Sequence, residues 1–338
     1  MILLTGGAGY IGSHTLVELA RAGYETVIFD NFSNASLHVL PRLEKITGQP
    51  ISFVVGDLLV EEDLENLFSA YPQIEAVIHF AGKKAVGESV ESPLMYYENN
   101  VQGTISLLRA MQRHDIRKLV FSSSATVYGD PEEVPISESA SLQPTNPYGR
   151  TKLMIEQILL DLKASWPDMS LAILRYFNPI GAHKSGLIGE DPAGIPNNLL
   201  PFVTQVAIGK RDKLSVFGSD YPTLDGTGIR DYIHVMDLAR GHVAALEKMG
   251  QEPQQGIYNL GTGRGYSVLE VVASFASVSG IKIPYQLVDR RPGDIARCYA
   301  DPAKAKRELS WEAQYGLDDM CRDAWHWQKN NPQGYEEG

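Results

Sequence analysis

The sequence predicts an α/β fold, in which a doubly wound parallel sheet of Rossmann type carries a smaller, irregular α/β domain. Two observations predict it. The first half of the chain alternates short apolar runs with longer stretches of helical periodicity, which is typical of parallel strands joined by crossover helices. The chain also opens with the apolar run ILLT, residues 2–5, directly before a glycine-rich turn. A run without polar alternation is typical of a strand that is covered on both faces.

The other elements follow from the same patterns. Short apolar runs bounded by turn residues predict strands, and longer stretches with helical spacing predict helices. We expect strands at residues 2–5, 26–29, 51–55, 75–80, 118–121 and 171–176, helices at residues 11–22, 93–112 and 148–163, and further sheet and helix at residues 233–245 and 258–261.

The composition of the chain changes after Asn178. Gly, Pro and Asn cluster in residues 179–201 and again in residues 218–228. We therefore predict one domain over residues 1–178 and a second over residues 179–338. Segments near residues 230–262 are expected to return to the first domain. The last seven residues, PQGYEEG, are interpreted as a loose tail.

Composition excludes several classes of function. The net charge of −11 disfavours nucleic-acid binding, which needs a basic surface. No apolar run approaches the roughly 18 residues that a membrane helix needs. The start lacks a basic region and reads as a strand, not a signal peptide. Two cysteines without a metal-ligand pattern favour a cytoplasmic protein without disulfides or a metal site.

The glycine-rich turn TGGAGYIG places Gly6, Gly9 and Gly12 at every third position, between a strand and a helix. A phosphate needs close backbone N–H groups, which a Cβ would obstruct, and a helix N-terminus favours negative charge. Asp30 ends the next strand, where its carboxylate can accept from ribose hydroxyls and repel a 2′-phosphate, which favours NAD over NADP. The alternative is a turn without a ligand, with Asp30 as a helix cap.

Tyr148 and Lys152 lie one helical turn apart in the run NPYGRTK, where Asn146 can cap the helix and Pro147 suits its first position. A phenol has a pKa near ~10, and a nearby lysine cation together with a positive nicotinamide ring stabilises the phenolate. The pair therefore indicates a catalytic base. The alternative is an exposed tyrosine and lysine on a solvated helix face.

Ser122, Ser123 and Ser124 follow the strand expected at residues 118–121. Ligands of an open parallel sheet bind outside the carboxyl ends of its strands. Ser124 is thus placed to hydrogen-bond a sugar hydroxyl beside Tyr148. The alternative is a serine cluster that satisfies loop backbone groups.

At this point the chain resembles a known family. TGGAGYIG, HFAG, SSSATVYG, YGRTK and RYFN are similar to motifs of the extended short-chain dehydrogenase/reductases. The later segments GIPNNLLP, FGSDYPTLDGTGIRDYIHVMDLA and RRPGD are more specific, and with them residues 1–335 resemble the UDP-glucose 4-epimerase family within that group.

The resemblance implies a set of site residues. Tyr148 is then the catalytic base, Lys152 binds the nicotinamide ribose and tunes the tyrosine, and Ser124 assists. Together with the glycine turn, the expected NAD-binding set is Gly6, Gly9, Tyr10, Ile11, Gly12, Asp30, Asn31, Asp57, Leu58, Phe80, Ala81, Lys84, Asn99, Ser122, Tyr148, Lys152, Tyr176 and Phe177. The expected UDP-sugar set is Ser124, Tyr148, Asn178, Asn198, Leu199, Phe217, Arg230, Arg291, Asp294 and Cys298.

The implied activity is reversible 4-epimerisation of UDP-glucose and UDP-galactose through a 4-keto intermediate with tightly bound NAD. The first domain would bind NAD and the second the UDP-sugar. Because the net charge of −11 disfavours a general attraction of an anionic substrate, the diphosphate needs local cations, and Arg230 and Arg291 are the candidates, unless they are surface ion-pair partners. A UDP-pentose 4-epimerase and a NAD-responsive regulatory protein remain alternatives. A nucleotide-sugar 4,6-dehydratase is disfavoured, because Ala125 and Thr126 provide no carboxylate after Ser124.

Two further expectations concern specificity and assembly. Cys298 stands where some family members carry tyrosine, so the freed volume could admit the 2-acetamido group of UDP-GlcNAc or UDP-GalNAc. Alternatively, a one-residue shift would place Tyr299 there, or Cys298 is a small buried thiol without such a role. Relatives pair through two long helices, whose counterparts are residues 93–112 and 148–163, so a homodimer is expected; the apolar stripes of both could instead pack on the sheet.

Overall fold

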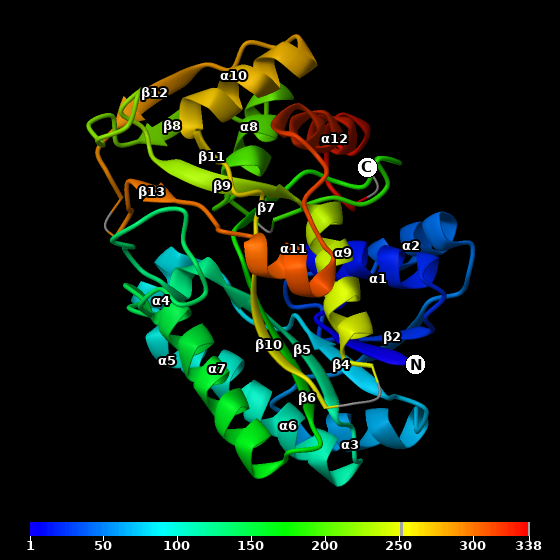
Figure 1. Cartoon of the computed structure of the whole chain (residues 1–338). Coiled ribbons are helices and arrows are strands. Elements are labelled where there is room, and N and C mark those ends of the chain that lie inside the picture. The colour runs from blue at the N-terminus through cyan, green and yellow to red at the C-terminus, as the bar shows by residue number, and fades with distance from the viewer. Residues whose placement is uncertain (193, 251–252, 292, 337–338) are drawn as a thin grey trace.

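The computed structural model describes residues 1–192, 194–250, 253–291 and 293–336. They form a large sheet flanked by helices, and a smaller α/β assembly that lies beyond the carboxyl ends of the strands of this sheet (Figure 1). The fold class predicted from the sequence is confirmed.

The large sheet has seven parallel strands in the order β10-β6-β5-β4-β1-β2-β3. Their bounds are β1 Ile2–Thr5, β2 Thr26–Asp30, β3 Ser52–Val55, β4 Ala76–His79, β5 Lys118–Ser124, β6 Ser170–Tyr176 and β10 Gln255–Leu260. The chain moves outward in one direction from β1 through β3 and in the other from β4 through β6. The strand order therefore reverses between β1 and β4, and ligands of such sheets bind in the crevice at that point.

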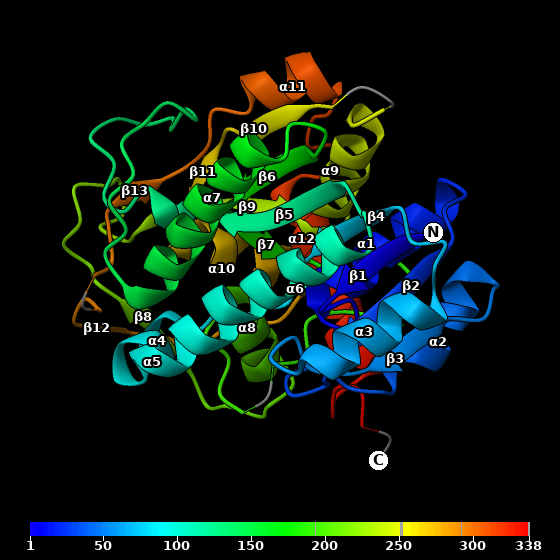
Figure 2. The ribbon, with the colours of Figure 1, turned by 90° about the horizontal axis from the view of Figure 1, so that it is seen from below.

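Helices cover both faces of this sheet (Figures 1 and 2). One face carries α1 (Tyr10–Arg21), α2 (Val39–Thr47), α9 (Val235–Lys248) and α11 (Ala303–Leu309), and the other carries α3 (Glu61–Ala70), α4 (Val86–Glu91), α6 (Gly103–Arg113) and α7 (Pro147–Ser165). Leu4 packs in the core of the first face and Leu3 in the core of the second. This explains why the opening run is apolar at every position.

The segment predicted as one helix over residues 93–112 is made of three joined pieces. They are α5 (Pro93–Tyr96), the π-helical segment η1 (Tyr97–Gln102) and α6. Within η1, buried Asn100 donates to Lys83 O at 3.0 Å and to Thr151 Oγ1 at 3.1 Å, and accepts from Lys83 N at 2.8 Å. The wider turn, of a kind often found near functional sites, thus ties the loop after β4 to α7.

The smaller assembly is built around β9 (Ile229–His234). It pairs with β7 (Asn178–Ile180), β11 (Gly265–Ser267) and β13 (Arg297–Cys298), while β8 (Leu214–Phe217) pairs with β12 (Tyr285–Val288). Helices α8 (Leu199–Ala207), α10 (Val268–Ser279) and α12 (Leu317–Asn330) pack on these strands in a separate core. Of the segment 230–262, α9 and β10 lie with the large sheet, whereas β9 lies in the smaller one.

The interpretation of the last residues as a loose tail is wrong for residues 332–336, and residues 337–338 lie outside the described part of the chain. Tyr335 is buried. Its hydroxyl donates to Gly189 O at 3.1 Å, and its backbone N–H donates to Asp191 at 2.8 Å. Its ring lies 4.8 Å from that of Trp327. One aromatic residue anchors this end because it finds both apolar and polar partners.

Gly12 offers a test of how closely α1 packs on the glycine turn. A Cβ at Gly12 would lie 2.6 Å from Gly6 O and 2.7 Å from Gly7 Cα. Because these are backbone atoms, we expect Gly12→Ala to lower the free energy of unfolding by about 1–3 kcal/mol in urea denaturation. The control Gly87→Ala adds a methyl that meets nothing within 4 Å in α4. It should be neutral or stabilise by about 0.5–1 kcal/mol. Equal stability of the two variants would contradict the close packing.

Candidate active site

The carboxyl ends of six parallel strands bring most of the expected NAD-binding residues to one edge of the large sheet. The set follows β1 (Gly6, Gly9, Tyr10, Ile11, Gly12), β2 (Asp30, Asn31), β3 (Asp57, Leu58), β4 (Phe80, Ala81, Lys84), β5 (Ser122) and β6 (Tyr176, Phe177). Asn99 joins them from η1. Sequence-distant residues meet there because parallel strands end at the same edge.

The glycine turn has the shape of an anion cradle. Gly6 has φ +68° and an added Cβ would lie 2.7 Å from Ala81 N, so packing alone requires glycine there. Gly9 is different: it caps α1 in an extended conformation, and a Cβ would have only Gly6 O, at 3.3 Å, within 4 Å. This single tight contact restricts Gly9 less than Gly6, and a glycine at this position also leaves room for a phosphate to approach the helix N-terminus. This geometry fits the diphosphate of a dinucleotide.

Asp30 is buried at the end of β2, where its side chain contacts the backbone of the glycine turn. Its carboxylate accepts from Ala8 N at 3.1 Å and from Phe32 N at 2.9 Å. Burial raises the pKa of Asp30, and these backbone hydrogen bonds oppose that rise. The next helix, α2, has His38 at its N-cap, so Asp30 does not act as a helix cap.

A second carboxylate lies beside Asp30 on the neighbouring strand. Asn31 Nδ2 donates to Asp57 Oδ2 at 2.9 Å, which joins the ends of β2 and β3. The acidic edge made by Asp30 and Asp57 suits ribose hydroxyls and repels an added phosphate.

Tyr148 and Lys152 lie together in the protein interior, at the start of α7. Asn146 caps this helix by accepting from Gly149 N at 2.9 Å, which confirms the predicted cap. Tyr148 is 7% exposed and Lys152 4%, so neither lies on a solvated helix face. Lys152 Nζ donates to Ser122 O at 2.8 Å and lies 4.9 Å from the centroid of the Phe121 ring. It lies 6.0 Å from the centroid of the Tyr148 ring.

The pKa of Tyr148 differs from what the lysine spacing alone predicts. Burial raises it to about 12, and hydrogen bonding to Ser124 opposes the rise. Burial also lowers the pKa of Lys152 to about 8, opposed by the Glu156 carboxylate. Desolvation is the main influence on the pKa of the phenol, and the Lys152 ammonium group is directed at Ser122 O.

The serine cluster forms the last part of β5, and its members face different partners. Ser124 Oγ accepts from Thr126 N at 3.2 Å and from Thr126 Oγ1 at 3.0 Å. Ser122 Oγ lies 2.8 Å from His242 Nε2. Ser124 thus satisfies local loop groups, as the alternative interpretation states, while it also interacts with Tyr148.

His242 is a residue that sequence reasoning missed. Its ring lies 4.8 Å from that of Phe80 and 6.1 Å from that of Tyr176. Burial lowers its pKa to about 4, so it is neutral. Its Nδ1 lies 2.9 Å from Leu238 O, which assigns the proton to Nδ1 and leaves Nε2 to accept from Ser122. A single histidine within the amphipathic α9 carries no sequence signal for this role.

The expected UDP-sugar residues from Asn178 onward come from several elements of the smaller assembly. Asn178 in β7 and Cys298 in β13 lie on strands that pair with β9, where Cys298 is opposite Arg230. Asn198 and Leu199 lie at the start of α8, Phe217 ends β8, and Arg291 and Asp294 lie between β12 and β13. Arg230 lies 3.5 Å from Asp294 and donates to Ile295 O at 2.8 Å. Near them, the Arg291 guanidinium lies 3.8 Å above the centroid of the Phe217 ring. The arginines are therefore held in place by local partners.

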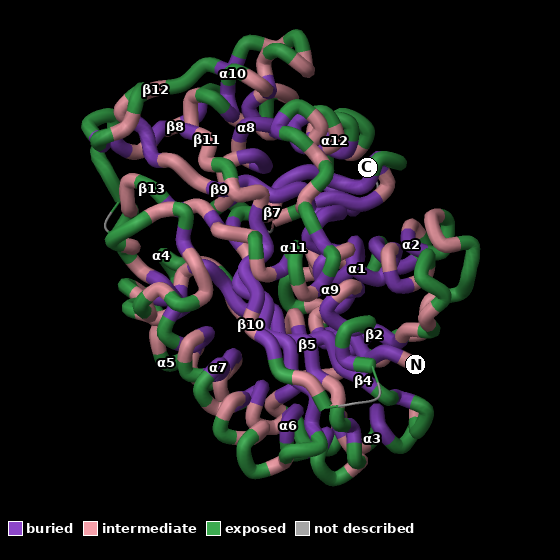
Figure 3. Tube along the Cα trace, viewed as in Figure 1, coloured by how far each residue is buried: buried purple, intermediate pink, exposed green. Residues whose placement is uncertain are grey.

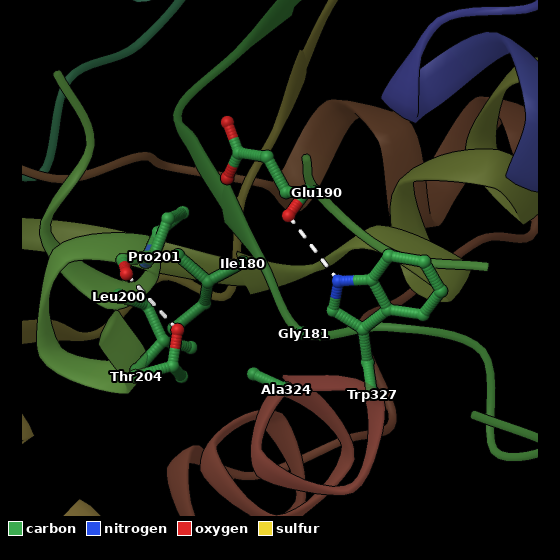
Figure 4. A pocket seen from close by; sticks show the side chains of 8 residues that line it. All are labelled: Ile180, Gly181, Glu190, Leu200, Pro201, Thr204, Ala324 and Trp327. Carbon is green, nitrogen blue, oxygen red and sulfur yellow. Dashed lines mark hydrogen bonds between the residues drawn. The ribbon is translucent and has the colours of Figure 1, made fainter. Parts of the chain in front are cut away.

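Glu190 is a second residue that sequence reasoning missed, and it joins the two domains. Its Oε1 accepts from Lys84 Nζ at 3.2 Å and from Asn198 Nδ2 at 2.6 Å. Its backbone oxygen accepts from Trp327 Nε1 at 3.3 Å (Figure 4). The cavity drawn there is lined by Ile180, Gly181, Glu190, Leu200, Pro201, Thr204, Ala324 and Trp327. One carboxylate oxygen thus holds an expected NAD residue and an expected UDP-sugar residue, next to Leu199 at the start of α8.

Cys298 and Tyr299 point to opposite sides of the small sheet, as successive strand residues do. Cys298 is buried in a cluster with Ala125 and Phe177. Tyr299 lies on the other side, where a Cβ built on Gly265 would be 3.0 Å from its ring. Cys298, and not Tyr299, therefore belongs to the buried cluster that contains the expected nicotinamide neighbour Phe177. Burial raises the pKa of Cys298 to about 11.

The described part of the chain contains no group of three His, Cys, Asp or Glu side chains arranged to hold a metal ion. Both cysteines, Cys298 and Cys321, are free and buried. No helix among the described residues combines the length and the apolar character that crossing a bilayer requires.

Comparison with known proteins gives a consistent result. Residues 2–261 match the model of the NAD dependent epimerase/dehydratase family. The chain is 62% identical to the UDP-glucose 4-epimerase of Bacillus subtilis (strain 168), over 99% of this chain and 98% of the relative.

Two solved structures are also closely similar. The UDP-glucose 4-epimerase from Bifidobacterium longum, in complex with NAD+ and UDP, superposes with a TM-score of 0.95 at 51% identity, covering 98% of this chain and 99% of that one. The enzyme from Stenotrophomonas maltophila, with bound NAD and formylated UDP-arabinopyranose, gives a TM-score of 0.96 at 49% identity, covering 98% of both chains.

Proposed function

The chain belongs to the NAD dependent epimerase/dehydratase family, among the UDP-glucose 4-epimerases, and from this premise we propose how its residues interconvert UDP-glucose and UDP-galactose through a 4-keto sugar. One observation carries the proposal. The Lys152–Ser122 hydrogen bond holds the buried Tyr148–Lys152 pair at the carboxyl end of β5, on the edge of the large sheet to which the glycine turn after β1 also belongs.

NAD, when bound, supplies an acceptor and later a donor for the hydride of carbon 4, and the positive charge of its oxidised nicotinamide ring. The glycine turn and Asp30 are the groups that would hold it, because the turn fits a diphosphate and the carboxylate suits ribose hydroxyls. Lys152 completes this set with a buried cation that Ser122 O keeps in place.

Tyr148 acts as the base. As phenolate it takes the proton of the sugar 4-hydroxyl while carbon 4 is oxidised, and it returns a proton to the 4-oxygen when carbon 4 is reduced on its other face. Burial raises the pKa of the phenol to about 12, and the positive charges of Lys152 and of the oxidised nicotinamide ring offset this effect. Ser124, which interacts with the phenol, orients the hydroxyl for this transfer. The protein ends the cycle in its starting protonation state.

The small domain anchors the nucleotide while the sugar turns. Because the chain has a net charge of −11, the diphosphate needs local cations, and Arg230 and Arg291 are preorganised by Asp294, Ile295 O and Phe217. Binding energy in the part of the substrate that does not react then holds the keto sugar during rotation.

One alternative substrate remains within this chemistry, and two other functions are disfavoured. The Stenotrophomonas maltophila structure contains a UDP-arabinopyranose derivative, which favours UDP-pentose as a further substrate. A 4,6-dehydratase would need an acid–base pair after Ser124, but Ala125 is apolar and Thr126 Oγ1 donates to Ser124. The intact, buried Tyr148–Lys152 pair also opposes a purely NAD-responsive regulatory role.

Replacing Tyr148 with Phe tests the proposed base. Loss of the phenolic oxygen should lower UDP-galactose conversion, assayed without added NAD, by roughly 10²–10⁴-fold. Tyr71→Phe removes a hydroxyl at the end of α3, far from the site, and should leave turnover unchanged. Near-normal conversion by the Tyr148 variant would refute the assignment.

Cys298 is proposed to leave room for a 2-acetamido group. Because the thiol packs beside Ala125 and Phe177, Cys298→Tyr should fill that space. We expect UDP-GalNAc turnover to fall by roughly 10–200-fold while UDP-galactose turnover is retained. Tyr299→Phe, which changes the opposite side of the strand, serves as the control. Undetectable UDP-GalNAc conversion by the unmodified enzyme would reject the wider pocket.

We also propose a homodimer through the helices on the α7 side of the sheet. The apolar stripes of α6 and α7 do pack on the sheet, but apolar side chains remain on the outer surface. Val90 in α4 is 63% exposed, Leu94 in α5 81% and Met154 in α7 42%. These three helices pack against one another, which brings the three elements together on the α7 side of the sheet.

Leu94→Glu is expected to weaken the dimer by placing a charge on this face, and sedimentation analysis should show a shift toward monomer. Leu287→Glu in β12, where the leucine is 52% exposed on the other domain, is the matched control and should leave the mass unchanged. A protein that is monomeric before mutation would contradict the proposal.

A further inference from the structure

A buried ion pair lies beside the catalytic face of α7. Glu156 and Arg175 have side chains that are 2% and 3% exposed. Arg175 contacts the carboxylate through Nε, at 3.1 and 3.2 Å, and through one terminal nitrogen at 2.6 Å. The bidentate geometry ties α7 to β6, the strand that ends at Tyr176.

The remaining polar atoms around this pair are also satisfied. Ser123 Oγ donates to Glu156 Oε1 at 2.5 Å, and Arg175 donates to Tyr128 Oη at 3.1 Å and to Glu138 O at 3.2 Å. Tyr128 in turn donates to Asn259 Oδ1 at 2.7 Å. The network therefore links α7 with β5, β6 and β10.

Stability alone does not explain such a pair. Desolvation of two charges offsets most of their attraction, and apolar replacements of similar volume are often neutral or stabilising. The position of the pair points to a different role. Glu156 lies one helical turn after Lys152 on the same face of α7. Adjacent residues of β5 hold the two side chains, since Ser122 O accepts from Lys152 and Ser123 Oγ donates to Glu156.

We propose that Glu156 and Arg175 are positioning residues, which set the orientation of α7 on β5 and β6 and maintain the positive charge of Lys152 beside Tyr148. This inference rests on the proposed function, because it assigns Lys152 a role in the reaction. The proposal adds the Glu156–Arg175 charges to the site, and neither residue belongs to the sequence motif around Tyr148.

The charges around Lys152 favour this role. Burial lowers its pKa to about 8, and the Glu156 carboxylate opposes that change. From β4, His79 also faces Lys152, but burial lowers the pKa of His79 to about 3 and keeps it neutral. Its two nitrogens contact Thr5 and Thr104 at 2.6 and 2.9 Å. From β5 the ammonium meets the Phe121 ring and Ser122 O, and on α7 the phenol of Tyr148.

The protonation state of Lys152 sets the direction in which the pH profile of kcat should move. Lys152 must be protonated to stabilise the phenolate, so activity falls as pH rises through its pKa. Removing the Glu156 charge lowers that pKa further. Removing the Arg175 charge as well acts in the opposite direction, but the carboxylate and not the guanidinium is the charge that shifts the pKa of Lys152. The alkaline limb of the kcat profile should therefore still move to lower pH, by up to about 1 unit. A role limited to stability would leave this limb in place.

The test uses Glu156→Leu combined with Arg175→Met, which removes both charges and keeps an apolar volume, since Glu156→Gln alone leaves a buried arginine unpaired. Folding is checked by circular dichroism, and kcat for UDP-galactose is measured across pH. The single variant Glu156→Asp keeps the negative charge beside Lys152. Its alkaline limb should therefore lie closer to that of the unmodified enzyme than the limb of the double variant does. Asp168→Asn, in the exposed Arg117–Asp168 pair at the other end of β5 and β6, is the control.

A folded double variant with a lower kcat and a shifted alkaline limb supports the proposal. A folded double variant with an unchanged kcat profile overturns it. Failure of the double variant to fold also overturns it, because the pair then serves stability. The proposed function fails separately, if the unmodified enzyme does not interconvert UDP-galactose and UDP-glucose at all.

Discussion

The contact between the Lys152 ammonium and the Ser122 carbonyl is the interaction on which the candidate site depends. At 2.8 Å it fixes a buried cation at the carboxyl edge of the large sheet and fixes the first turn of α7 with it. The cation is costly to bury unless its donors are satisfied, so the carbonyl at the end of β5 and the aromatic face of Phe121 both contribute. Tyr148 takes its position from the same turn.

Burial around this contact also creates a requirement. The same desolvation that strengthens electrostatic interactions raises the pKa of the phenol and lowers that of the lysine. Burial of the phenol therefore opposes formation of the phenolate. In the function proposed above, the positive charge of the oxidised nicotinamide would offset this effect and would couple base strength to cofactor binding.

The two domains are connected through polar contacts close to the site. Tyr10, in the glycine turn, donates to Gly181 O at 2.7 Å, and Glu190 bridges Lys84 and Asn198. Expected cofactor residues and expected substrate residues thus share partners, and the sheet edge is closed by the smaller domain. Because the chain is acidic overall, binding of a diphosphate would rely on local cations such as Arg230 and Arg291 and not on a general positive surface.

The sequence by itself determined the features that depend on local order along the chain. Apolar runs predicted the strands of the large sheet, because backbone conformation acts over a few residues. The spacing of the glycines, and of Tyr148 and Lys152, led to the predictions of a phosphate cradle and a catalytic base. The resemblance to family motifs led to the prediction of the substrate-binding residues.

Tertiary structure decided the features that depend on residues far apart in the chain. Five such features involve hydrogen-bond or ion-pair partners from distant segments. They are the π-helical turn at Asn100, the contact of His242 with Ser122, the buried Tyr335, the contact of Glu190 with Lys84, and the Glu156–Arg175 pair. The choice of Cys298 over Tyr299 as neighbour of Phe177 was settled by strand register. The direction of the pKa of Tyr148 was also set by folding, because desolvation is a property of the packed interior and not of any local pattern.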